Sequence, residues 1–151
     1  MTSHEYSDQD DPFNLTRFVS AQQSTFDVAL SELRRGRKES HWIWFIFPQM
    51  DGLGSSPTAI RYAIRSQDEA RAYLNHSVLG PRLLQCCRAI LLVRGKSASE
   101  IMGYPDDLKL RSSMTLFSLV TGSHPEFGEV LEKYFEGQPD QRTIELLNVQ
   151  S

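Results

Sequence analysis

Two short segments contain the residue types best suited to chemistry, and the first runs from His41 to Gln49. It contains two tryptophans and two phenylalanines. A Trp ring offers a large apolar face with a hydrogen-bonding edge and can stack on a planar base or sugar. Histidine is a common general acid or base in enzymes. We therefore expect Trp42, Trp44 and Gln49 to bind a ligand and His41 to transfer protons, with core filling as the alternative role for the rings.

The second segment begins at Asp106, where a late helix is expected to start. The amino end of a helix favours an anionic ligand, and the cations Lys109 and Arg111 would add to that attraction. Lys109, Arg111 and the nearby Ser112 are therefore the predicted ligand-binding residues. Asp106 is predicted to orient a water or hydroxyl, which makes it the second catalytic candidate. Spacings of three (Asp106 and Lys109) and four (Asp107 and Arg111) also fit ordinary surface ion pairs, worth a few tenths of a kcal/mol each. That reading stays open.

These two segments make one site only if the fold brings them together, so we predict that Trp44 and Lys109 lie close to each other. The predicted ligand is a small anionic molecule of the nucleotide or ribosyl type. The protein would either hydrolyse such a ligand or bind it without turnover. The alternative is a protein-interaction domain in which part of the aromatic run is exposed as an anchor.

Other motifs carry less information. The loop from Gly52 to Pro57 could cradle a phosphate, but it lacks the Walker lysine, and a glycine turn is the favoured interpretation. The histidines show no HxH or HExxH spacing, and the adjacent Cys86 and Cys87 would point to different faces of a helix. The sequence therefore predicts no metal and no cofactor.

Composition sets outer limits on fold and partners. The 151 residues are 40% hydrophobic and carry a net charge of −3, which suits one globular domain over 11–151. Such a charge does not favour nucleic acid as a bulk partner. No apolar run is long enough to span a bilayer, so we expect a cytoplasmic protein without membrane contact. The polar stretch 1–10 is predicted to be a disordered tail, and the oligomeric state stays open.

Local signals along the chain are helical throughout. Capping boxes begin at Ser66 and Ser97, and a glycine at 36 follows two arginines, as at a helix end. The run from Pro81 is expected to form the central helix. The aromatic run is expected to be a short buried helix that Pro48 ends. Together these signals predict an all-α domain of about seven to eight helices.

Several strings are familiar as a set: residues 40–49, 51–55, 70–82 and 105–117. With them the chain closely resembles the bacterial and fungal domain-of-unknown-function family 1810, whose members often carry the mistaken label calpastatin. The resemblance covers Asp11 to Leu147 and implies a multihelical fold but no established reaction. No calpastatin-like inhibitory repeat is visible. Where the family usually has Trp-Met-Trp, this chain has Trp42, Ile43 and Trp44.

Overall fold

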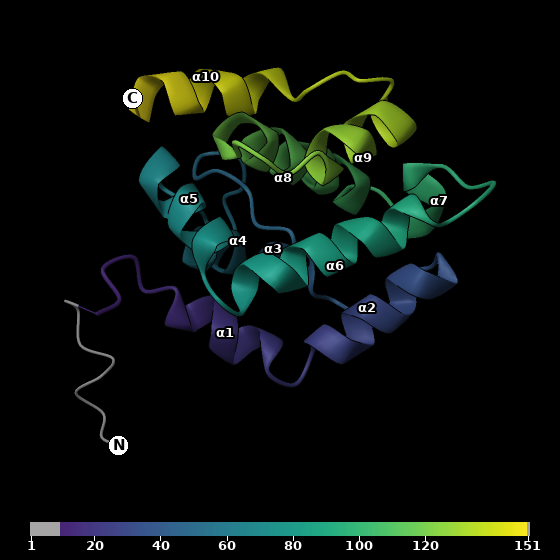
Figure 1. Ribbon diagram of the computed structural model, residues 1–151, viewed down its shortest axis with the longest axis horizontal. Coiled ribbons are helices and arrows are strands. Elements are labelled where there is room, and N and C mark those ends of the chain that lie inside the picture. Colours follow the sequence, from purple (N-terminus) through teal and green to yellow (C-terminus); the bar gives the residue numbers. More distant parts are fainter. Residues whose placement is uncertain (1–9, 151) are drawn as a thin grey trace.

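The computed structural model describes residues 10–150, and within that range it contains ten helices and no strand (Figure 1). The helices are α1 Thr16–Gln22, α2 Phe26–Arg35, α3 Ile43–Ile46, α4 Pro57–Arg61, α5 Gln67–Asn75, α6 Leu79–Leu91, α7 Ala98–Met102, α8 Asp106–Val120, α9 Glu126–Phe135 and α10 Gln141–Gln150. The predicted all-α fold is confirmed. The predicted number of seven to eight helices is wrong, and three of the ten described helices, α3, α4 and α7, are single turns of four or five residues. The predicted tail lies outside the described residues, except for Asp10.

The core forms around α6 and α8. Helix α6 packs against α2, α5 and α9, whereas α8 packs against α3, α5, α7, α9 and α10. Both helices bury apolar residues at helical spacing: Leu83, Cys87 and Ile90 on α6, and Leu110, Met114 and Phe117 on α8. Among residues 10–150, no helix is long and apolar enough to cross a membrane. The two central helices are thus the frame on which both candidate segments are placed.

Capping residues explain several helix starts. Ser97 and Glu100 form the reciprocal capping box that the sequence predicts for α7. At α5, Ser66 accepts from the amide of Glu69 as expected. The carboxylate of Glu69, however, accepts from the amide of Arg65 and not from that of Ser66. This second box is therefore only half formed, and the carboxylate is left available for a long-range partner.

The first helix begins at Thr16, three residues later than the apolar pattern suggests. The backbone of Asn14 is left-handed, with φ of 53°, which keeps residue 13 out of the helix. The carboxylate of Asp11 accepts hydrogen bonds from the amides of Leu15 and Thr16 at 2.7 and 3.0 Å. Although partial burial raises the pKa of Asp11, a hydrogen bond from the Thr16 hydroxyl, together with these amide bonds, lowers it overall. Asp11 thus caps α1 and fixes the loop that precedes it.

The aromatic run forms α3, the short buried helix that the sequence predicts. After Pro48 the chain is held by an isolated parallel bridge between Met50 and Ile64. In this bridge Ile64 donates to the carbonyl of Gln49 at 2.9 Å, and Asp51 donates to the carbonyl of Ile64 at 2.8 Å. The bridge ties the segment after α3 to the link between α4 and α5.

Candidate functional site

The structure brings part of the predicted site together where α3 packs against α8. The ammonium group of Lys109 lies 5.1 Å from the centroid of the Trp44 ring. Asp106 forms ion pairs with two lysines: its Oδ1 lies 3.3 Å from Lys109 Nζ, and its Oδ2 lies 2.8 Å from Lys38 Nζ. Both ammonium groups are therefore bound to the same carboxylate, so each of them already has an anionic partner within the fold.

Lys38 belongs to this cluster, although the sequence pattern did not single it out. Its side chain is 5% exposed. Its ammonium group donates to the carbonyl of Ser40 at 2.6 Å and lies 4.9 Å from the centroid of the Trp42 ring. No helical or strand spacing relates residue 38 to Asp106, so only the fold reveals the pair.

A buried carboxylate, Glu32, holds the segment that leads into α3. Its Oε1 accepts from the indole N–H of Trp42 at 2.8 Å and from the amides of Glu39 and Ser40, and its Oε2 accepts from the Ser40 hydroxyl at 2.6 Å. Burial raises the pKa of Glu32, but these donors outweigh burial and lower it to about 2. Trp42 itself is fully buried, so its ring has no face open for a stacked ligand.

The other predicted site residues are dispersed. His41 is exposed, and Gln49 is half-buried. Arg111 donates to the carbonyls of residues 138 and 139 at 2.8 and 3.1 Å, so it holds the loop before α10. Ser112 is buried and donates to the carbonyl of Leu108 within α8. Of the eight predicted residues, the described contacts therefore join only Trp44, Lys109 and Asp106.

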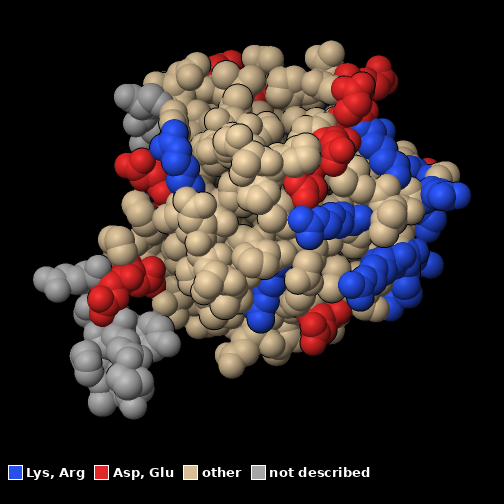
Figure 2. Space-filling model, in the orientation of Figure 1, with Lys and Arg blue, Asp and Glu red and all other residues tan. Residues whose placement is uncertain are grey.

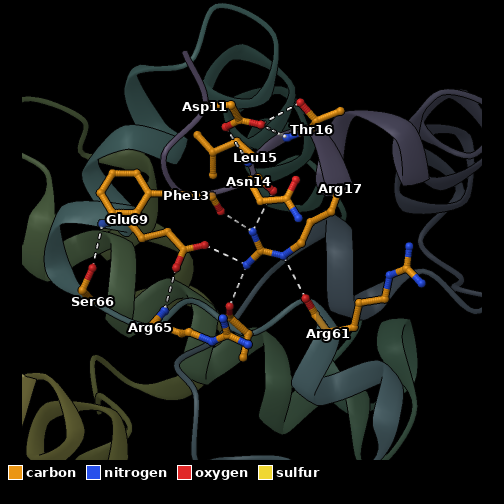
Figure 3. A network of polar contacts seen from close by, with 11 residues as sticks. Asp11, Phe13, Asn14, Leu15, Thr16, Arg17, Arg61, Arg65, Ser66 and Glu69 are labelled. Carbon is orange, nitrogen blue, oxygen red and sulfur yellow. Dashed lines mark hydrogen bonds and ion pairs between the residues drawn. The ribbon is translucent and has the colours of Figure 1, made fainter. Parts of the chain in front are cut away.

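A cavity of about 620 Å³ lies elsewhere, between the segment at the start of α1 and the link from α4 to α5 (Figure 3). It is lined by Pro12, Phe13, Asn14, Arg17, Arg61, Arg65, Ser66 and Glu69. Three arginines on one cavity distinguish it from the predicted site. None of these arginines is among the site residues predicted from the sequence.

Arg17 is the structural centre of this cavity. All five of its N–H groups donate hydrogen bonds, to the carbonyls of Phe13, Asn14, Arg61 and Ala63 and to the carboxylate of Glu69. The ion pair with Glu69 is 2.7 Å long, and the two side chains are 10% and 4% exposed. A guanidinium has five donors, so Arg17 has none left for a ligand. It is a scaffold residue.

Arg61 and Arg65 differ from Arg17 because their side chains are exposed. The guanidinium of Arg61 lies 5.6 Å from the centroid of the Tyr62 ring. Within residues 10–150, no carboxylate forms an ion pair with Arg61 or Arg65. Figure 3 shows Arg65 beside the Arg17 network and the side chain of Arg61 extending away from it. Among the charged residues that line this cavity, Arg61 and Arg65 are thus the two without an ion pair in the described part of the chain.

Comparison with known proteins confirms the predicted family. Residues 12–147 match the family model described as "Protein of unknown function (DUF1810)". The chain belongs to the DUF1810 family. The crystal structure of the conserved hypothetical protein Rv1873 from Mycobacterium tuberculosis is similar, with 53% sequence identity and a TM-score of 0.89. That match covers 91% of this chain and 98% of the mycobacterial chain. A search of curated proteins finds no match.

Sequence reasoning about this DUF1810 chain missed the arginine-lined cavity for a physical reason. Arg17 and Glu69 are 52 residues apart, so no helical or strand spacing connects them. The half-formed capping box at α5 gave Glu69 a local role and concealed its long-range one. Arg61 and Arg65 stand four apart, but α4 ends between them, so the spacing alone does not place them on one surface.

Proposed function

We propose that this DUF1810 protein binds a small anionic molecule in the cavity lined by Arg61 and Arg65. The proposal rests on one observation: two exposed guanidinium groups, unpaired with any described carboxylate, line a cavity of about 620 Å³. Small-molecule pockets are typically about 300–1,000 Å³. A guanidinium presents a planar fork of donors that matches phosphate and carboxylate oxygens.

The Arg17 network supports this proposal by fixing the wall of the cavity. The bonds from Arg17 to the carbonyls of Arg61 and Ala63 hold the backbone between the two free arginines. Glu69 holds the same segment from the other side through the amide of Arg65. Because Arg17 and Glu69 neutralise each other, the attraction for an anion comes from Arg61 and Arg65. A preorganised site loses less conformational entropy when a ligand binds.

The other lining residues narrow the class of ligand. Phe13 is half-buried and supplies an apolar surface, whereas Asn14 and Ser66 supply polar edges. This combination suits a phosphate or carboxylate attached to a planar or apolar group, and nucleotide- and ribosyl-type compounds belong to that class. Both oxygens of Glu69 accept hydrogen bonds, so the cavity does not supply a free general base. We therefore propose binding rather than hydrolysis.

A thermal-shift screen tests the proposal. The compounds are inorganic phosphate, AMP and ADP-ribose, with uncharged adenosine and ribose as comparisons. We expect at least one anion to raise the melting temperature, since a ligand that binds only the folded state stabilises it. The shift should disappear in the double variant Arg61→Gln, Arg65→Gln. It should persist in Arg71→Gln, Arg142→Gln, which removes two exposed arginines that form local ion pairs.

The same screen separates this cavity from the cluster at Trp44. The variant Lys109→Ala should keep the anion-induced shift, because Lys109 does not line the cavity. A shift that survives loss of Arg61 and Arg65 but disappears with Lys109→Ala would move the site to α8. If none of the three anions changed the melting temperature, the proposal would be contradicted.

A further inference from the structure

We propose that the ends of α2 and α6 form a docking surface for a short acidic segment of another protein that carries an apolar side chain. We call this surface the basic end and define it by Arg34, Arg35, Arg37, Arg88, Arg94 and Lys96. Figure 2 shows Lys and Arg gathered at the right-hand end of the molecule, where α2 and α6 end in Figure 1. This inference is independent of the cavity at Arg61 and Arg65.

The first observation is the segregation of charge. The stretches 34–37 and 88–96 contain six of the 16 Lys and Arg residues and no Asp or Glu. The rest of the chain is left with ten Lys and Arg against 19 Asp and Glu. A net charge of −3 therefore conceals a strongly basic end on an otherwise acidic molecule. Such a distribution attracts and orients an acidic partner.

The second observation is that the two stretches form one continuous surface. Lys96 donates to the carbonyl of Gly36 at 3.0 Å. Gly36 is left-handed, with φ of 74°, and a Cβ there would lie 3.1 Å from Val93. The ends of α2 and α6 are therefore in direct contact, and Arg34 and Arg88 line the same cavity of about 280 Å³.

The third observation is that some of these cations are not used within the fold. Arg88 pairs with Glu126 at 2.8 Å, and Arg35 lies 3.8 Å from Glu39. Helix ends attract cations, which explains the bond from Lys96 to the carbonyl at the end of α2. Among the described ion pairs, however, none involves Arg34, Arg37 or Arg94, and all three are exposed. Those three guanidinium groups could therefore form ion pairs with the carboxylates of a partner.

The fourth observation is an exposed apolar residue in the cavity that Arg34 and Arg88 line. Leu92 is 79% exposed and lines the 280 Å³ cavity together with Ala89, Gln85 and the two arginines. One exposed leucine is ordinary on a protein surface, but beside arginines without an ion pair it gives an acidic peptide a second, apolar kind of contact. A partner residue such as leucine would bury Leu92 while neighbouring carboxylates meet the arginines.

The same lining favours a protein segment over a nucleic acid. Single-stranded nucleic acids bind through bases stacked on aromatic rings, and none of the five residues that line this cavity is aromatic. An exposed leucine contributes nothing to a phosphate backbone. The acidic remainder of the molecule would also repel a long polyanion, whereas a short acidic segment can stay within the basic end.

Fluorescence anisotropy with synthetic peptides tests this inference. The probe is a labelled peptide of about eight residues, six glutamates and two leucines, and a second peptide replaces the leucines by serines. We expect the leucine peptide to bind the full chain at least about fivefold more tightly. Arg34→Gln, Arg94→Gln should weaken its binding about tenfold, with Arg71→Gln, Arg142→Gln within about twofold of the wild type. Circular dichroism verifies that each variant is folded.

The variant Leu92→Ser provides the second arm. It should remove the preference for the leucine peptide and leave the binding of the serine peptide unchanged. Single-stranded RNA and phosphatidylserine vesicles provide the third arm. Equal binding of both peptides, no effect of the Arg34 and Arg94 substitutions, or tighter arginine-dependent binding of RNA or vesicles would each overturn the proposal.

Discussion

The ammonium group of Lys109 lies 5.1 Å from the centroid of the Trp44 ring and joins α8 to α3. These residues are 65 positions apart and come from the two segments that the sequence singled out. The contact is a cation–π interaction at a partly exposed position, and Asp106 holds the same lysine. The contact therefore helps to hold α3 against α8, whether or not a ligand binds there.

A double-mutant cycle measures this contact. We expect Trp44→Leu and Lys109→Met to show a coupling energy of about 0.5–1 kcal/mol in urea unfolding. Trp44→Leu removes the ring and Lys109→Met removes the charge, so each single substitution abolishes the cation–π contact. Strictly additive effects would show that the two side chains do not interact in solution.

Glu32 should make the protein sensitive to acid. Its pKa is lowered from 4.5 to about 2 in the folded state, so the folded protein binds fewer protons than the unfolded chain in that interval. The resulting stabilisation is complete above about pH 4.5 and is lost as the pH falls towards 2. Unfolding experiments across this window should show a weaker pH dependence for Glu32→Gln than for the wild type. Parallel curves would contradict the assigned role.

Arg17 should be essential for stability. Removal of one partner from a buried ion pair costs about 3–5 kcal/mol, so Arg17→Gln should lower the free energy of unfolding by about that amount. The matched variant Arg71→Gln breaks an exposed pair with Asp68 and should cost less than about 1 kcal/mol. Chemical denaturation compares the two, and equal small losses would mean that the Arg17 network is not a scaffold.

Two helical glycines should respond to alanine in opposite directions. A Cβ on Gly80 would lie 2.0 Å from the carbonyl oxygen of Leu74, so Gly80→Ala must push α5 and α6 apart and should cost about 2 kcal/mol or more. Gly128 in α9 has no atom within 4 Å of such a Cβ. There Gly128→Ala should stabilise the helix by about 0.5–1 kcal/mol. Thermal unfolding of both variants tests the close packing of α5 on α6.

Local patterns were enough to predict much of the fold. Capping serines, helix-ending glycines and apolar spacing predicted the helices and the short buried α3, because these signals act within a few residues. The helix count was too low because a capping box marks where a helix such as α7 begins, whereas packing against neighbouring helices decides whether five residues stay helical as a separate element. The half-formed capping box at Ser66 is a similar case, in which a tertiary contact of Glu69 replaced a local one.

The candidate sites were less predictable because they depend on long-range contacts. An aromatic run cannot reveal that Trp42 turns inward to Glu32 whereas Trp44 faces Lys109. Likewise, nothing local shows that the fully bonded Arg17 leaves Arg61 and Arg65 as the free cations of the larger cavity. The clustering of arginines near residues 34 and 94 was visible in the sequence, but the net charge concealed its meaning.

Amide NMR spectra recorded during titration with AMP and inorganic phosphate test the central claim most directly, because they locate the bound anion. If an anion binds the proposed cavity, the largest shifts will come from residues 13–14 and 61–66, and they will vanish in Arg61→Gln, Arg65→Gln. Saturable shifts confined to the amides around Trp44 and Lys109, or no saturable shift with either anion, would contradict the account.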